Sequence, residues 1–371
     1  MAEGLRVQEL EDVVIRFSGD SGDGMQLAGN ILSTVSATVG NDVSTFPDFP
    51  ADIRAPQGSL TGVSGYQVHI SDTQVFTPGD KCDVLVAMNA AALKTQYSYA
   101  RPTAIIIIDT ANFTPQYLRK ANFETDDYLE EMRIDPDRVV ACPISTMVKT
   151  SLRSCGLDNK DILKRRNMFA LGMVCWLFNR DLSLVESYLN KKFKKKLDVA
   201  QANIKVFAAG YHYGINTQTS VPVTYRIESH HKMPGRYMDI SGNKALAYGL
   251  MAATEKAGVK LFLGSYPITP ASDILHELAK HKSMGIITMQ CEDEIAGCST
   301  AIGASFAGGL GITSTSGPGI CLKSEAMNLA VMVELPLVVI DVQRGGPSTG
   351  LPTKTEQSDL LQVLYGRNGE S

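Results

Sequence analysis

The 371-residue sequence has no long hydrophobic run and no excess of positive charge. No apolar stretch approaches the roughly 20 residues needed to cross a bilayer. The acidic start MAEGLRVQELEDVVIRF lacks the basic and apolar regions of a signal peptide. The net charge of −4 and the pI of about 5.9 disfavour nucleic acid and anionic membranes as partners. We therefore expect a cytoplasmic protein that binds neither nucleic acid nor membrane.

The sequence also lacks paired cysteines. Its seven cysteines are scattered and form no CxxC pair, which favours reduced thiols over a disulfide framework. The pattern argues against an iron–sulfur cluster or structural zinc held by this chain alone. His230 and His231 are adjacent but have no second ligand group at helical or hairpin spacing. We expect a surface or linker role for them and no metal site.

What the sequence does contain is two series of alternating strands and helices. In the first, residues 11–18 predict a strand that runs into the glycine-rich turn 19–24 and a helix at 25–39. Further strands are expected at 82–88, 104–109 and 138–142, and helical stretches at 160–178 and 183–213. This alternation predicts a mostly parallel sheet with helices on its faces.

An irregular stretch at 214–235 is expected to connect two domains, 1–213 and 236–371. The second series has strands at 260–264, 285–290, 310–315 and 335–342, and helices at 242–257, 271–280, 294–307 and 322–333. This order predicts a doubly wound sheet. The chain stops at Gly369-Glu370-Ser371, soon after a helix. Two interpretations stay open: the sequence is a fragment truncated at its C-terminus, or it is only part of a longer subunit.

Three loops of the second domain follow strands, where open α/β sheets place their ligands. The first, at 266–270, has two prolines that make it rigid and fix the Thr269 hydroxyl. Its alternative role is to cap the next helix. The third, at 313–319, combines hydroxyls with Gly-Pro-Gly, a tight turn that brings the backbone close to a ligand or is merely structural.

The second loop is Glu292-Asp293-Glu294, ahead of the small-residue helix IAGCSTAIGASFAGG. The small residues let another helix or subunit approach closely. A glutamate here could be a helix cap or a dipole partner. Three acidic residues in a row exceed what a cap needs, which favours a role in proton transfer.

Together these loops resemble a known family. Glutamate, small-residue helix, strand and T-S-G-P-G are similar to the pyrimidine-binding domain of thiamine-diphosphate enzymes. YPITP and PLVVIDVQRGGPSTGLPTKTEQSDL (336–360) narrow the resemblance to the 2-oxoacid:ferredoxin oxidoreductases. The first half resembles the family's γ-type domain fused ahead of α, and residues 46–58 look like the version in 2-oxoglutarate and broad 2-oxoacid enzymes. The implied fold is a γ-type α/β domain followed by a doubly wound pyrimidine-binding domain.

The resemblance implies roles for individual residues. Glu294 rather than Glu292 matches the glutamate that hydrogen-bonds the aminopyrimidine ring, because the small-residue helix starts directly after it. Thr269 and Arg344 match residues that bind the substrate's carboxylate and keto groups, and an arginine fork suits a carboxylate. The alternative for Arg344 is a surface ion pair. Further substrate-binding candidates are Thr353 and Lys354, and the expected cofactor-binding set is Tyr266, Pro267, Ile268, Glu294, Ser316 and Gly317.

The implied protein is an α subunit that converts a 2-oxoacid, with 2-oxoglutarate favoured, to acyl-CoA and CO2. Electrons pass to ferredoxin, and the reverse reductive carboxylation is the CO2 fixation of the reductive tricarboxylic acid cycle. The chain shows no clear Gly-Asp-Gly…Asn diphosphate–magnesium motif. We therefore expect a β subunit that shares thiamine diphosphate and carries Mg2+ and an iron–sulfur cluster, in an (αβ)2 heterotetramer. Coenzyme A is the expected co-substrate.

Two other interpretations stay open. A non-redox thiamine-diphosphate decarboxylase or carboligase shares the glutamate and TSGPG features, and a non-catalytic flavodoxin-like binding module fits the first domain alone. The glycines at 19, 22 and 24 by themselves indicate a nucleotide site, although Asp20 and Asp23 would repel phosphates. The resemblance implies instead a domain that covers the active site and helps form a coenzyme A channel. Five lysines within 191–196 either attract coenzyme A phosphates or form a solvated helix face.

Overall fold

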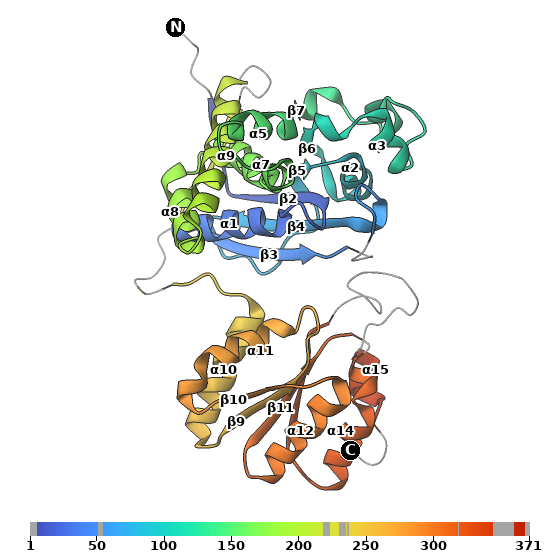
Figure 1. Cartoon of the computed structure of the whole chain (residues 1–371), viewed down its shortest axis with the longest axis vertical. Coiled ribbons are helices and arrows are strands. Elements are labelled where there is room, and N and C mark those ends of the chain that lie inside the picture. The colour runs from blue at the N-terminus through green and yellow to red at the C-terminus, as the bar shows by residue number, and fades with distance from the viewer. Residues whose placement is uncertain are drawn as a thin grey trace. The chain divides into compact units, whose positions relative to one another are not determined.

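The structure of the chain, a computed structural model (Figure 1), describes residues 6–50, 55–217, 223–229, 235, 237–317, 319–343 and 360–367. The chain divides into two compact units, unit 1 (Met1–Asp239) and unit 2 (Ile240–Ser371). Each unit has its own sheet and its own hydrophobic cores. His230 and His231 lie outside the described residues. Within the described ranges, every helix is too short or too polar to traverse a lipid bilayer.

Unit 1 is built around a six-stranded sheet with the order β3-β4-β2-β5-β6-β7. Its parallel strands, all expected from apolar runs, are β2 (Asp12–Asp20), β5 (Cys82–Ala87), β6 (Ala100–Asp109) and β7 (Val139–Cys142). The sequence did not reveal two further strands, β3 (Asp42–Asp48) and β4 (Val63–Ser71). Strand β4 pairs antiparallel with β2, and β3 pairs antiparallel with β4. The sheet is therefore mixed, and the predicted parallel arrangement holds for the four neighbouring strands β2, β5, β6 and β7.

Helices cover both faces of this sheet. One face carries α1 (Met25–Thr38), α5 (Ile144–Leu152), α6 (Asn159–Leu163), α7 (Arg166–Leu177), α8 (Leu182–Lys192) and α9 (Leu197–Asn216). The other carries α2 (Ala90–Gln96), α3 (Pro115–Lys120) and α4 (Tyr128–Glu131). In β5, Val84 and Val86 face the first core, while Leu85 and Ala87 face the second. This alternation is that of a strand buried on both sides.

The stretch expected to be irregular, 214–235, contains regular structure. Helix α9 extends to Asn216, and β8 (Val223–Ile227) pairs in parallel with β1 (Arg6–Leu10). Ile227 belongs to the core of unit 1. The expectation is therefore wrong at these positions, because β1 supplies backbone hydrogen-bond partners that no local periodicity reveals.

Unit 2 has a four-stranded, fully parallel sheet with the order β10-β9-β11-β12. The strands are β9 (Leu261–Ser265), β10 (Ile287–Gln290), β11 (Leu310–Thr315) and β12 (Leu337–Asp341). One face is covered by α10 (Gly242–Ala257) and α11 (Ser272–Leu278), and the other by α12 (Glu294–Phe306) and α14 (Ser324–Met332) (Figure 1). The doubly wound layout is confirmed. The helix expected at 322–333 is divided into α13 (Gly319–Leu322) and α14, with Lys323 between them, and α15 spans Leu360–Tyr365.

Candidate active site

The strand order of unit 2 reverses at β9. The chain passes from β9 to β10 on one side and then to β11 on the other. The crevice beyond the carboxyl ends of β9 and β11 is therefore the topological switch point, where open α/β sheets bind ligands. The first predicted loop follows β9, and the third contains the end of β11 and the turn after it. The fold thus brings these two loops to the place where a ligand is expected.

Hydroxyl groups join the ends of β9 and β11. The hydroxyls of Ser265 and Ser314 lie 2.7 Å apart, and those of Tyr266 and Thr315 lie 2.8 Å apart. All four side chains are buried. Gly317, further along the third loop, has a φ of 55°, in the left-handed region that favours glycine. Paired buried polar groups hold both loops in fixed positions.

Glu294 is the first residue of α12, which follows β10. The N-cap is Asp293, whose Oδ1 accepts a hydrogen bond from the backbone N–H of Ala296 at 2.9 Å. The Glu294 carboxylate makes no hydrogen bond or ion pair with any described residue. Glu294 is half-buried, whereas Glu292 is exposed. Because Asp293 serves as the cap, the capping alternative for Glu294 does not hold.

Gly319 marks the point where the three loops meet. A Cβ at this position would lie 2.2 Å from Thr315 Oγ1, 2.5 Å from the Tyr266 hydroxyl and 3.3 Å from Glu294 Cγ. Residues from all three predicted loops therefore pack closely around Gly319, and a side chain at this position would clash with them. Ser316, in the same turn, is buried, and its hydroxyl has no hydrogen-bond partner among the described residues. An unpaired carboxylate and an unpaired hydroxyl suit a polar ligand.

Lys323 lies at this site, although the sequence did not single it out. Its side chain is fully buried, and its ammonium group donates to the backbone carbonyl of Glu294 at 2.9 Å and to Thr313 Oγ1 at 3.0 Å. Burial lowers the pKa of Lys323, while nearby thiol and carboxyl groups counteract part of this effect. A lysine at a helix start is usually exposed, so its sequence context carried no signal.

The remaining predicted residues differ in accessibility. Pro267 and Thr269 are exposed in the loop after β9, and Ile268 is half-buried. Ala271, and not Thr269, occupies the N-cap position of α11. Three predicted substrate-binding residues lie outside the described part of the chain: Arg344, Thr353 and Lys354.

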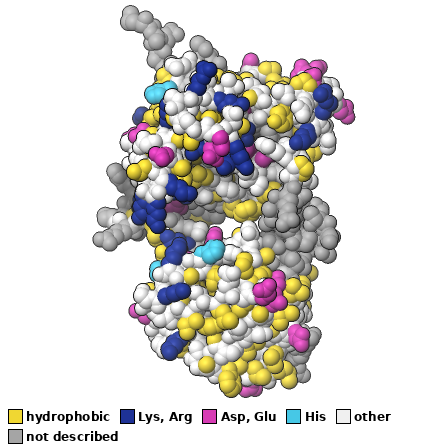
Figure 2. Space-filling model, in the orientation of Figure 1, with side chains coloured by type: hydrophobic (Ala, Val, Ile, Leu, Met, Phe, Trp, Pro, Cys, Tyr) yellow, Lys and Arg dark blue, Asp and Glu magenta, His cyan; other side chains and the backbone are white. Residues whose placement is uncertain are grey.

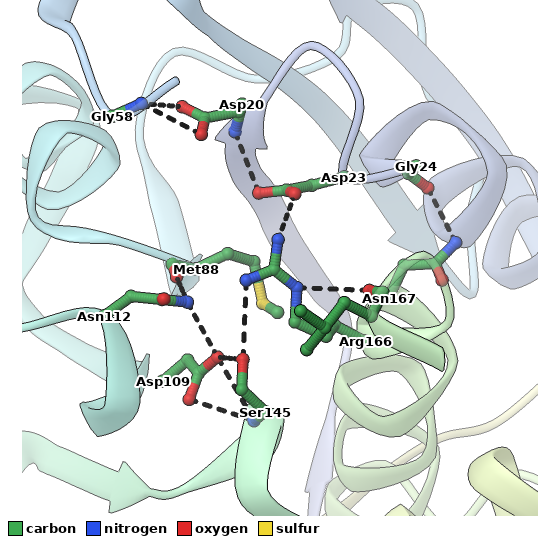
Figure 3. A network of polar contacts seen from close by, with 11 residues as sticks. Asp20, Asp23, Gly24, Gly58, Met88, Asp109, Asn112, Ser145, Arg166 and Asn167 are labelled. Atoms are coloured by element: carbon green, nitrogen blue, oxygen red, sulfur yellow. Dashed lines mark hydrogen bonds and ion pairs between the residues drawn. The ribbon is translucent and has the colours of Figure 1, made fainter. Parts of the chain in front are cut away.

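The glycine-rich turn of unit 1 contains a buried polar network (Figure 3). Asp23 pairs with the guanidinium group of Arg166 on α7, and Arg166 lies 3.4 Å from the Ser145 hydroxyl. Ser145 at the start of α5 donates its N–H and hydroxyl to Asp109 at the end of β6. The network therefore ties together the carboxyl ends of several parallel strands.

Asp20 lies beside this network. Its carboxylate accepts from the N–H of Gly58 at 3.0 and 3.1 Å. Burial, followed by the charge of Asp23, raises the pKa of Asp20. Burial also raises the pKa of Asp23, and Arg166 counteracts part of this rise. Because both carboxylates make internal contacts, the turn itself does not resemble a phosphate cradle.

A cavity of about 610 Å3 opens beside the turn. It is lined by Asp20 and Asp23 together with Lys160, Lys164 and Arg166. Its volume lies in the range of small-molecule sites. Lys160 is exposed, whereas Lys164 is paired with Asp161 at 2.8 Å. The five lysines within 191–196 are all exposed at the end of α8 and in the following turn, as a solvated surface requires.

Comparison with known families gives two matches. The family described as pyruvate ferredoxin/flavodoxin oxidoreductase matches residues 14–213. The family described as pyruvate flavodoxin/ferredoxin oxidoreductase, thiamine diphosphate-binding, matches residues 253–369.

Relatives resemble nearly all of the chain. The 2-oxoglutarate oxidoreductase subunit KorA of Mycobacterium tuberculosis is 51% identical over 98% of this chain and 55% of its own length. The 2-oxoacid:ferredoxin oxidoreductase 1 subunit alpha of Aeropyrum pernix is 28% identical over 97% of this chain and 59% of its own length. The solved 2-oxoglutarate:ferredoxin oxidoreductase from Magnetococcus marinus, with 2-oxoglutarate, coenzyme A and succinyl-CoA bound, has 34% identity and a TM-score of 0.73, covering 97% of this chain and 57% of its own. The chain thus spans little more than half the length of these relatives.

The fold and the converging loops define a two-domain α/β protein whose second domain is of the thiamine-diphosphate-binding type. The chain belongs to the pyruvate ferredoxin/flavodoxin oxidoreductase family. The family resemblance and the domain order expected from the sequence are confirmed.

Proposed function

We propose that this chain is the α-type part of a 2-oxoglutarate:ferredoxin oxidoreductase that uses thiamine diphosphate. The complete enzyme forms acyl-CoA and CO2 from a 2-oxoacid and reduces ferredoxin, or runs the reverse reductive carboxylation. The observation that carries the proposal is the Glu294 carboxylate, which has no described hydrogen-bond or ion-pair partner and lies beside Gly319, where the three loops meet. The named substrate of the relative that is 51% identical favours 2-oxoglutarate.

The residues at the switch point fit the aminopyrimidine ring of thiamine diphosphate. Glu294 would hold a proton at a ring nitrogen, as a half-buried carboxylate without an internal partner can. The unpaired Ser316 hydroxyl offers one further hydrogen bond. Gly319 lets the third loop pack against Tyr266 and Thr315, whose paired hydroxyls would form one side of the ring's site. When bound, thiamine diphosphate supplies the nucleophilic carbon that adds to the keto group of a 2-oxoacid.

The substrate is proposed to bind beyond the cofactor-binding loops. Thr269 is exposed in the loop after β9, where a ligand from solvent can reach it. Arg344 follows β12, whose neighbour in the sheet is β11, and its planar guanidinium group suits the carboxylate of a 2-oxoacid. Thr353 and Lys354 are proposed to extend the same site.

Coenzyme A is the proposed acyl acceptor, with Lys160 and Lys164 beside the unit 1 cavity as candidates for its phosphates.

The proposal includes a β-type partner that holds the diphosphate, Mg2+ and iron–sulfur cluster in an (αβ)2 assembly. Figure 2 shows hydrophobic side chains spread over the surface of unit 2. Among them, Phe306 of α12 is 82% exposed and Met332 of α14 is 80% exposed. Large exposed apolar side chains on neighbouring helices are typical of contact surfaces. These side chains support a partner subunit that covers α12 and α14. Glu294 lies at the N-terminal end of α12.

The test uses the complete complex with its partner subunit. The wild-type complex should reduce a viologen dye in a reaction that requires both 2-oxoglutarate and coenzyme A. Glu294→Gln should lower turnover at least about 100-fold, because it removes the proton-handling group but keeps its size. Viologen reduction and assembly by size-exclusion chromatography are measured together.

Glu292→Gln is the matched control. Glu292 carries the same chemical group two positions away but is exposed, so this variant should keep wild-type turnover. An assembled Glu294→Gln complex with wild-type activity would refute the assignment. A panel of 2-oxoacids assayed on the wild-type complex tests the substrate, and a preference for pyruvate over 2-oxoglutarate would contradict this part of the proposal.

A further inference from the structure

Lys323 is a buried cation that the proposed function does not yet use. It lies between α13 and α14 with none of its side chain exposed. A lysine is almost never fully buried unless it is paired, since a charge removed from water loses its solvation. Within the described part of the chain no carboxylate oxygen lies at ion-pair distance from its ammonium group. The ammonium instead makes two hydrogen bonds to neutral oxygens.

Those contacts connect all three loops of the candidate site. The Glu294 carbonyl, 2.9 Å away, belongs to the first turn of α12, and Thr313 Oγ1, 3.0 Å away, belongs to β11. The ring of Tyr266, in the loop after β9, lies 5.2 Å from the ammonium nitrogen, within the range of a cation–π contact. Lys323 therefore touches the residues that place the Glu294 carboxylate and the ring of Tyr266.

The groups around Lys323 give it no counter-ion contact within the described residues. Its surroundings include the thiols of Cys298 and Cys291 and the carboxylates of Glu294 and Asp293. Burying such an ammonium costs stability, and an apolar side chain of similar length often replaces a buried charge without loss. The fold of unit 2 gains little from a cation here. Groups that are costly to the fold are typical of functional sites.

We propose that Lys323 is a positioning residue for Glu294. It anchors the first turn of α12 to the end of β11 and thereby sets the position from which the Glu294 carboxylate meets the aminopyrimidine ring. This inference rests on the proposed function of Glu294 and deepens it. The residue itself does not touch substrate, since its side chain is fully buried.

The experiment compares wild-type complex with Lys323→Met, which keeps the length of the side chain and removes the ammonium. The direct readout is the rate at which the thiazolium C2 proton of bound thiamine diphosphate exchanges with deuterium, measured by quenched-flow NMR. We expect this rate and kcat to fall about 10- to 100-fold, because a small misplacement of a reacting group has effects of this size. The KM for 2-oxoglutarate should stay within about two-fold, since substrate contacts are not altered. The melting temperature should be unchanged or higher.

Two further variants complete the design. Thr313→Val removes one acceptor and leaves the contact with Glu294, so its exchange rate should fall less than that of Lys323→Met. Lys280→Met removes an exposed lysine of the same unit, which is paired with Glu277, and should exchange like wild type. If Lys323→Met does not fold, Thr313→Val decides, and a wild-type exchange rate in that variant overturns the proposal.

The outcomes separate this inference from the proposed function. A fast wild-type rate that Glu294→Gln abolishes supports the role of Glu294. If Lys323→Met then exchanges as fast as wild type, the positioning role of Lys323 is wrong while the proposed function stands. If the wild-type complex does not accelerate exchange over free cofactor, the proposed function itself fails. A fall in exchange that tracks a matching loss of melting temperature would show that Lys323 is only structural.

Discussion

Some buried charged groups of the described residues have an ion-pair partner and others do not. In unit 1, Asp23 has the guanidinium group of Arg166 as its partner. Asp20 accepts from neutral donors, the N–H of Gly58 and the side chain of Asn89, with a second carboxylate nearby. In unit 2, Lys323 is bonded to neutral oxygens. Asp20 and Lys323 are therefore buried groups that lack an ion-pair partner within the described part of the chain, an arrangement that costs stability.

The first residue-scale prediction concerns Asp20 and pH. Burial raises the pKa of Asp20 above its ordinary value of 3.8, so the folded state binds this proton more tightly than the unfolded chain. The contribution to the free energy of unfolding is then fully present below the ordinary pKa and is lost as pH rises through the folded pKa. Asp20→Asn removes the titration and keeps an acceptor for Gly58. Its melting temperature should fall less than that of wild type as pH rises from the ordinary value towards neutrality.

Asp181→Asn is a control of opposite sign. Asp181 is the N-cap of α8, and hydrogen bonds from Ser183 lower its pKa. Its contribution to stability is present above the ordinary pKa and is lost as pH falls. The variant should therefore be less stable than wild type at neutral pH and equal to it in acid. Parallel pH profiles of melting temperature for wild type and Asp20→Asn would contradict the effect assigned to Asp20.

Local sequence predicted the site residues unequally. The order of strand, acidic loop and small-residue helix placed Glu294 at the carboxyl edge of a parallel sheet, and its proposed role, in preference to Glu292, came from the family resemblance. Lys323 could not be found, because its burial depends on the break between α13 and α14, and the sequence predicted one continuous helix there. The pairing of Asp23 with Arg166 spans 143 positions, and no local pattern reports such a contact.

At the scale of elements, apolar periodicity located the parallel strands but not β3 and β4. Strand β4 contains Gly65 and the buried Gln67, which accepts a hydrogen bond from Arg16 of β2. Strand β3 contains Pro47, a residue confined to edge strands, and β3 lies at the edge of the sheet. Strand β4 is held in part by polar side-chain pairing, and β3 lies at the sheet edge. Neither sequence is therefore a continuous apolar run of the kind that marks a buried parallel strand. The short strands β1 and β8 form hydrogen bonds only with each other within the described sheets. They were missed because neither is an apolar run.

The element-scale prediction concerns the turn between β11 and α13. Gly319→Ala would place a Cβ within 2.5 Å of two buried hydroxyls, those of Thr315 and Tyr266. Their pairing must break or the turn must shift, at about 1–3 kcal/mol for overpacking. We expect a lower melting temperature and weaker binding of thiamine diphosphate to the assembled complex, measured by differential scanning fluorimetry and calorimetric titration.

Gly249→Ala in α10 is the matched control. A Cβ there meets no atom within 4 Å, and alanine in a helix is more favourable than glycine by about 0.5–1 kcal/mol. This variant should be slightly more stable than wild type and bind the cofactor equally well. Cofactor binding by Gly319→Ala at wild-type affinity would show that the close packing of the loops around Gly319 is not needed to hold the ring.

At the scale of the whole molecule, the described residues form two sets of hydrophobic cores, and no residue of one set belongs to the other. Unit 1 contains one core on each face of its sheet, and unit 2 likewise. The two families that match the chain also match separate stretches, 14–213 and 253–369. The sequence placed the domains at 1–213 and 236–371, and we propose that division with the end of α9 and strand β8 added to the first domain. It implies that each part unfolds as its own cooperative unit.

Core substitutions test this division. Leu263 of β9 and Leu85 of β5 are both fully buried, each in the core of a different unit. Leu263→Ala and Leu85→Ala should each cost about 2–5 kcal/mol through lost burial and the cavity left behind. Scanning calorimetry of the chain should resolve two transitions, with Leu263→Ala lowering one and Leu85→Ala lowering the other. The two variants match in chemistry and burial, so each is the control for the other. A single transition that both variants lower equally would mean that the units unfold together. The proposed domains would then not be independent cooperative units.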